Sequence, residues 1–257
     1  MSIQNGKSLV LNKNTRAMVQ GPSGSGKTIL SGYTLRYPQA RPVHWLDFDL
    51  RLESLQTVFS EKDFEHLTYE SFRDGAVPGS AFQAAVLWVN KMLLAYRKED
   101  PALPRTIVLD SLTFAARSAM VGVLHADGKP SDMQPYQDHY GKMGAKVEDL
   151  ISKLTALPCN VLVSAHERLI EDKVTGRIYQ DLDIINSLRN RIPGYFNERW
   201  HTEVTPAGPN KPAAYVVRTK SGHNVDARTC YASLEVIEPA AEVWHKIELE
   251  KAMRNAA

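Results

Sequence analysis

The segment Gly21-Pro-Ser-Gly-Ser-Gly-Lys27-Thr28 constrains this chain more than any other feature, because it matches the pattern GxxxxGK[ST] in full. Glycines let the backbone curl so that successive N–H groups face the oxygens of a phosphate. The lysine reaches the outer phosphates of a nucleotide, and the next hydroxyl is a ligand for Mg²⁺. A strand-like run at residues 17–20 precedes the motif and a helical pattern follows it. We therefore predict a phosphate-binding loop rather than a flexible glycine turn.

The expected cofactors are ATP and Mg²⁺. The predicted nucleotide contacts are the eight residues of the loop: Gly21, Pro22, Ser23, Gly24, Ser25, Gly26, Lys27 and Thr28.

Short apolar runs alternate with longer helical patterns along the first two thirds of the chain. The runs are residues 16–20, 43–48, 106–110 and 160–164, and they are typical of strands buried on both faces of a parallel sheet. The helical patterns are residues 27–36, 80–98 and 140–157. This alternation predicts an α/β fold with a mostly parallel central sheet flanked by helices.

The last third changes character. Residues 199–205 and 214–220 alternate between polar and apolar, and a turn-rich connector separates them, which predicts a late antiparallel hairpin at the sheet edge. Residues 232–237 are a further strand candidate. The loop candidates are residues 72–79, 127–138 and 167–181. We expect a single domain over residues 1–238 and a C-terminal helix or tail over residues 239–257.

Composition narrows the class of protein. The 257 residues carry 31 basic and 29 acidic side chains, so a binder that works by bulk positive charge is excluded. Two cysteines are too few for a disulfide framework. Residues 1–6 do not resemble a signal peptide, and the most apolar stretch, residues 81–95, is broken by polar side chains. We expect a cytoplasmic protein with no membrane partner.

Three predicted strands end in polar side chains that suit a nucleotide site. Asp110 closes the third strand and, with Thr28, is the expected metal group, although an aspartate there can also cap the next helix. Asp47 and Asp49 are two residues apart at the end of the second strand, so both are expected on one face. His166 leaves the fourth strand, where it can sense the outermost phosphate or be merely structural.

These strand ends, in this order, resemble the RecA/Rad51 ATPase core, and most closely its short phage-encoded members, which are described as nucleotide-binding or single-strand annealing proteins. The resemblance covers roughly residues 16–220. It implies a RecA-like fold in which Asp49 activates water and His166 is the sensor. RecA itself has glutamate at the first of these positions, and Asp47 or Glu53 could substitute for Asp49.

The resemblance also implies single-stranded DNA as a partner, with a single-strand-binding protein as a further candidate. It places DNA-contacting loops at residues 123–140 and 167–191. The second segment mixes cations with tyrosines, a combination that suits single strands, although a solvated β-hairpin would look similar. The predicted nucleic-acid contacts are Arg168, Lys173, Arg177, Arg189 and Arg191.

In the same family a neighbouring subunit supplies cations to the nucleotide site, which implies a homo-oligomer, either a ring or a filament. Here that role would fall on Arg218 and Lys220, two residues apart on a predicted strand, with Arg228 as a spare candidate. The alternative is an ordinary edge strand that carries charges.

The predicted function is ATP binding and hydrolysis by a DNA-stimulated ATPase in phage recombination, through annealing or strand pairing. If the protein is phage-encoded, it would act in the bacterial cytoplasm. Three alternatives stay open: a motor or helicase loader, a nucleotide-gated interaction module, and a small-molecule kinase.

Overall fold

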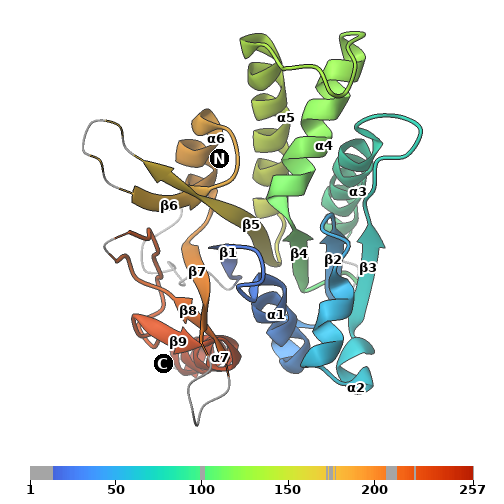
Figure 1. Ribbon diagram of the computed structural model, residues 1–257. Helices are drawn as coiled ribbons and strands as arrows, with labels where there is room; N and C mark the ends of the chain where they lie inside the picture. The colour runs from blue at the N-terminus through green and yellow to red at the C-terminus, as the bar shows by residue number, and fades with distance from the viewer. Residues whose placement is uncertain are drawn as a thin grey trace, which may run out of the picture.

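The computed structural model describes residues 14–98, 102–171, 173, 176, 178–206, 213–222 and 224–256. Within these residues the strands are β1 (Arg16–Gly21), β2 (Val43–Asp47), β3 (Leu67–Ser71), β4 (Thr106–Asp110), β5 (Asn160–Glu171), β6 (Ile178–Leu182), β7 (Glu198–Thr205), β8 (Ala214–Arg218) and β9 (Ile237–Pro239). They form one sheet in the order β3-β2-β4-β5-β1-β7-β8-β9, with β6 paired to β5 outside this path (Figure 1).

The sheet is parallel from β3 to β7 and antiparallel in the β5–β6, β7–β8 and β8–β9 pairs. The predicted α/β fold is therefore confirmed, as is the late hairpin, which here is β7 and β8. β9 then covers the outer side of β8.

The helices are α1 (Lys27–Gly32), α2 (Glu61–Phe64), α3 (Ser80–Tyr96), α4 (Leu112–Ala126), α5 (Gln137–Thr155), α6 (Asn186–Arg191) and α7 (Ala240–Ala256). Short 3₁₀ turns add residues 33–36, 38–40, 52–57 and 192–195. α3, α4 and α5 pack on one face of the sheet, and α1 and α7 pack on the other (Figure 1).

The buried strands explain why both faces are covered. Successive side chains of a strand point to opposite faces, so Ile107 and Leu109 of β4 enter the core beneath α3–α5, whereas Val108 enters the core beneath α1. The C-terminal helix α7 belongs to the second core through Val243 and Trp244. This arrangement brings the carboxyl ends of β1, β2, β4 and β5 to one edge of the sheet.

Two expectations for the second half of the chain are corrected. Residues 167–171 and 178–181 are not a loop, because β5 continues to Glu171 and pairs with β6 as an antiparallel arm, in line with the β-hairpin left open as an alternative. The strand expected at residues 232–237 begins only at Ile237, since Ser233 and Glu235 use their backbone N–H groups to bind glutamate side chains instead.

No helix among the described residues is long and apolar enough to cross a membrane. The expectation about a signal peptide at residues 1–6 lies outside the described residues.

Candidate active site

The phosphate loop lies between β1, which ends at Gly21, and α1, which begins at Lys27. Gly24 and Gly26 have φ angles of 78° and 93°, in the left-handed region that favours glycine. Gly26 also needs the absence of a side chain, because a Cβ there would lie 2.5 Å from Cδ1 of Tyr215 on β8. Ser25 fixes the base of the loop through a 2.6 Å hydrogen bond between its hydroxyl and that of Thr202 on β7.

Lys27 is buried and folds back onto its own loop. Its Nζ donates hydrogen bonds to the carbonyl oxygens of Gly21 (2.9 Å) and Pro22 (2.8 Å). Burial lowers the pKa of this lysine, against the opposing effect of Asp110 and Asp49. The charge is thus held by weak acceptors in the loop, where an anionic phosphate would be a stronger partner.

Asp110 connects the loop to the sheet. Thr28 Oγ1 donates a 2.7 Å hydrogen bond to Asp110 Oδ2, and the Ser164 hydroxyl on β5 donates to Oδ1. Burial and then the neighbouring Asp49 raise the pKa of Asp110. Buried carboxylate and hydroxyl oxygens are the ligands that Mg²⁺ prefers, so Thr28 and Asp110 fit the predicted metal role. The peptide bond between Asp110 and Ser111 is cis.

Asp49 and His166 are brought together, although 117 positions separate them in the sequence. His166 Nε2 lies 2.9 Å from Asp49 Oδ2, and Ser111 donates a 2.6 Å hydrogen bond to Asp49 Oδ1. The backbone N–H of His166 donates a hydrogen bond to the Thr113 hydroxyl, and this bond fixes the start of the β5 extension. Burial works to raise the pKa of Asp49, but the hydrogen bonds from His166 and Ser111 outweigh it and the pKa is lowered.

These groups line one cavity of about 150 Å³, which we call the phosphate pocket. Its walls come from the loop, from the segment after β2, from β5 and from β8. The lining residues are Ser23, Gly24, Gly26, Lys27, Thr28, Ile29, Asp49, Arg51, Ser54, His166 and Tyr215. The geometry can hold a polyphosphate at one end and present a carboxylate to its outermost group.

A model of the AAA domain family matches residues 13–231, which is most of the chain. The chain belongs to the AAA domain family. It is therefore a P-loop ATPase domain by descent. No curated protein sequence matches it significantly.

Several solved structures are similar to this AAA domain at low sequence identity. They include an ATPase from the type III secretion system of pathogenic bacteria (14% identity, 73% of this chain and 50% of that one, TM-score 0.47). A second is KaiC-like protein PH0186 from Pyrococcus horikoshii OT3 (10% identity, 84% of this chain and 81% of that one, TM-score 0.40). A third is flagellar accessory protein FlaH from Methanocaldococcus jannaschii (13% identity, 88% of this chain and 86% of that one, TM-score 0.44). This chain spans half the length of the first. With TM-scores below 0.5, these similarities carry no argument about activity.

Asp47 does not face the phosphate pocket, which corrects the expectation that both aspartates share one face. β2 ends at Asp47, and residues 48 and 49 form a bend, so the two-residue period of a strand does not extend to Asp49. Asp47 Oδ1 accepts the Leu50 N–H at 2.8 Å. With Glu53, it lines a separate cavity of about 490 Å³, so neither substitutes for Asp49 in this geometry.

Replacing Asp47 with asparagine is expected to stabilise the AAA domain in a pH-dependent way. Burial and the nearby Asp110 and Asp49 raise the pKa of Asp47 to about 6. The folded state therefore binds more protons than the unfolded state, and Asp47 costs stability as the pH rises from about 4 through 6. The asparagine amide keeps an oxygen for the Leu50 N–H, so the gain should be about 1 kcal/mol near pH 4.5 and about 3 kcal/mol at pH 7.5. Urea unfolding at both pH values measures it, and an equal gain at each would contradict the raised pKa.

The cations proposed to act on a neighbouring subunit lie away from the chain's own phosphate pocket. Arg218 is the last residue of β8 and pairs with Glu203 on β7 at 3.2 Å. Lys220 lies beyond the end of β8, so the expected shared strand face for Arg218 and Lys220 is wrong. Arg228 donates to the carbonyl oxygens of Pro193 and Phe196 and is bound within the fold.

The predicted DNA contacts do not form one surface. Arg168 on β5 and Lys173 beyond it are exposed, and Arg177 lies outside the described residues. Arg191 binds Glu148 at 2.6 Å across α6 and α5. Arg189 is only 7% exposed, which corrects the expectation of a contact at the surface: the short helix α6 turns it inward, where Nε donates to the Ile184 carbonyl.

Several residues of the site were missed from the sequence. Ser111, Ser164 and Thr113 hold Asp49, Asp110 and His166 in place, and their only sequence signal is a position at or beside a predicted strand end. Arg51 and Tyr215 line the phosphate pocket without any local pattern. They reach it through the turn after β2 and through the pairing of β8 with β7.

Proposed function

We propose that this AAA domain binds ATP with Mg²⁺ in the phosphate pocket and hydrolyses it. The observation that supports this most is the connected set of side chains at the strand ends, from Thr28 through Asp110 on one side to Ser111, Asp49 and His166 on the other. Lys27 would leave the loop carbonyls for the β- and γ-phosphates. Thr28 and Asp110 would hold Mg²⁺, which neutralises charge on the phosphates when bound.

In the proposed mechanism Asp49 accepts a proton from the water that attacks the γ-phosphate in line. The hydrogen bonds from His166 and Ser111 lower its pKa, and a base with a low pKa is weak. His166 would therefore turn from Asp49 to the γ-phosphate once ATP is bound. That exchange would leave Asp49 more basic only when there is a phosphate to attack.

We further propose that the ATP state controls the grip on single-stranded DNA, in annealing or strand pairing during phage recombination. The support is continuity: His166 lies in β5, and the same strand continues as the arm that carries exposed Arg168 and leads to Lys173. A sensor and a cationic arm on one strand can move together. Single-stranded DNA should therefore stimulate ATP turnover, and the stimulation should fade as salt rises, because phosphate contacts release counterions.

The test compares the wild type with an Arg168→Ala, Lys173→Ala double variant, with and without single-stranded DNA at two salt concentrations. The matched control is Lys153→Ala, which removes a half-buried lysine of α5 that pairs with Asp149. We expect unstimulated turnover to be equal in all three proteins and stimulation to be lost in the double variant alone. Turnover indifferent to DNA in the wild type would contradict a role on DNA.

A homo-oligomer with shared sites is proposed as well, with Arg218 and Lys220 facing a neighbour's phosphate pocket. The observation that supports this proposal is that neither residue lines the phosphate pocket of its own chain. Arg218 ends β8 of the late hairpin, and Lys220 lies just beyond it. Mixing Asp49→Asn with Arg218→Ala protein should then restore part of the turnover that each lacks. A mixture as inactive as its components argues against sharing.

A second candidate is a nucleotide-gated interaction module that scarcely hydrolyses ATP. The observation that favours it is that both carboxylate oxygens of Asp49 already have hydrogen-bond donors. Tight ATP binding without release of phosphate, with or without DNA, would select this function over the first.

A further inference from the structure

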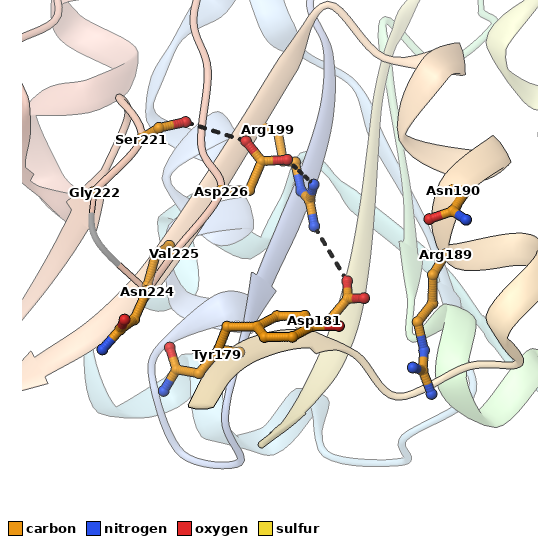
Figure 2. Close-up of a pocket in the computed structure, with 11 residues that line it drawn as sticks. Tyr179, Asp181, Arg189, Asn190, Arg199, Ser221, Gly222, Asn224, Val225 and Asp226 are labelled. Carbon is orange, nitrogen blue, oxygen red and sulfur yellow. Dashed lines mark hydrogen bonds and ion pairs between the residues drawn. The ribbon is translucent and has the colours of Figure 1, made fainter. Parts of the chain in front are cut away.

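A second polar cavity lies apart from the phosphate loop. It has a volume of about 520 Å³, within the range of small-molecule pockets, and lies between β6, α6, β7 and residues 221–222 and 224–226 (Figure 2). We call it the Arg189 pocket. Its lining residues are Tyr179, Gln180, Asp181, Arg189, Asn190, Arg199, Ser221, Gly222, Asn224, Val225 and Asp226.

Arg199 is paired with carboxylates of the same fold. Its Nε donates to Gln20 Oε1 at 2.6 Å. Nη1 pairs with Asp226, and Nη2 lies 3.6 Å from Asp181 Oδ1 (Figure 2). One guanidinium therefore faces both carboxylates of the pocket and reduces their repulsion of an anion. The charge of Arg199 is matched by these two carboxylates.

Arg189 differs from Arg199 because its charge is not matched. It is 93% buried, since only 7% of it is exposed, and Nε donates to the Ile184 carbonyl at 2.9 Å. Its Nη2 is buried, and no described residue accepts a hydrogen bond from it. A buried guanidinium nitrogen without an acceptor is costly, so an anionic partner would be bound favourably.

We propose that the Arg189 pocket binds a small oxyanion, a phosphate or carboxylate group, through the Arg189 guanidinium. Arginine presents a fork of donors that matches either group. Tyr179, Asn190 and Asn224 add polar groups elsewhere on the cavity wall, with Asn224 on the side opposite Arg189 (Figure 2). The site is separate from the phosphate pocket: the two share no lining residue.

The test is calorimetric titration of the full chain with inorganic phosphate and, separately, with citrate. A saturating non-hydrolysable ATP analogue and Mg²⁺ are present throughout, so that the β- and γ-phosphate positions of the phosphate pocket are filled and do not compete for the probe. Arg189→Gln should weaken binding at least tenfold, the effect of losing a charge-assisted hydrogen bond. Arg191→Gln, on the same helix but paired with Glu148 outside the pocket, is the matched control and should bind within about twofold of the wild type.

Asn190→Asp keeps the proposal testable if Arg189→Gln does not fold. Asn190 is exposed, so the fold should tolerate the change, and the new carboxylate beside Arg189 should also weaken binding about tenfold. Binding of phosphate alone or citrate alone supports the site and identifies the oxyanion. The proposal is overturned if neither probe binds the wild type, or if Arg189→Gln and Asn190→Asp bind as the wild type does.

Discussion

Replacing Asp49 with asparagine is expected to lower ATP turnover by about 10² to 10⁴, the usual contribution of a general base. The amide keeps an oxygen for the Ser111 hydroxyl and remains within reach of His166, so the fold and the phosphate loop should be preserved. Affinity for ATP should therefore change by less than about threefold, well below the tenfold effect of a lost charged contact. Single-turnover hydrolysis and equilibrium nucleotide binding separate the two effects.

Glu53→Gln is the matched control for Asp49→Asn. Glu53 lies four residues further along the chain and lines the neighbouring cavity with Asp47 rather than the phosphate pocket. Its replacement should leave turnover unchanged. If Glu53→Gln is inactive while Asp49→Asn is active, the general base is Glu53 and not Asp49.

Lys27→Ala is expected to weaken nucleotide binding tenfold or more and to abolish measurable turnover. A charge-assisted contact to phosphate contributes about 1.5–3 kcal/mol, and 1.4 kcal/mol is a factor of ten. The loop also loses the two hydrogen bonds from Nζ to Gly21 and Pro22. Fluorescence titration with a labelled nucleotide measures the affinity.

Lys153→Ala serves as the control for the loss of a lysine, because Lys153 is a half-buried residue outside the phosphate pocket that pairs with Asp149 on its own helix. Thermal unfolding of both variants shows whether Lys27→Ala is folded. If the Lys27→Ala protein is folded and binds ATP like the wild type, Lys27 is not a phosphate-binding residue.

The parallel part of the fold could be predicted because its strands are buried on both faces. Such strands appear as continuous apolar runs, and residues 106–110 coincide with β4. β3 could not be found in this way, since four of its five residues are exposed at the sheet edge. The β5–β6 arm was expected only as the alternative to a DNA-contacting loop, for a similar reason: past His166 the strand is held by pairing with β6, and its side chains follow no buried pattern.

The site was predictable where chemistry coincides with a strand end. Asp110 and His166 lie at the carboxyl edge because their strands end or emerge from the core there, and Thr28 is fixed by its motif. Side chains set by turns and long-range pairing were not predictable. The bend at residues 48 and 49 separates Asp47 from Asp49, the pairing of β8 with β7 brings Tyr215 over Gly26, and α6 buries Arg189.

Release of phosphate from ATP by the wild type, Lys27→Ala and Asp49→Asn, with and without Mg²⁺, tests the central proposal most directly. We expect turnover by the wild type that requires Mg²⁺, none by Lys27→Ala, and a loss of at least a hundredfold in Asp49→Asn with ATP still bound. Turnover that persists in Lys27→Ala, or that does not depend on Mg²⁺, would contradict hydrolysis in the phosphate pocket.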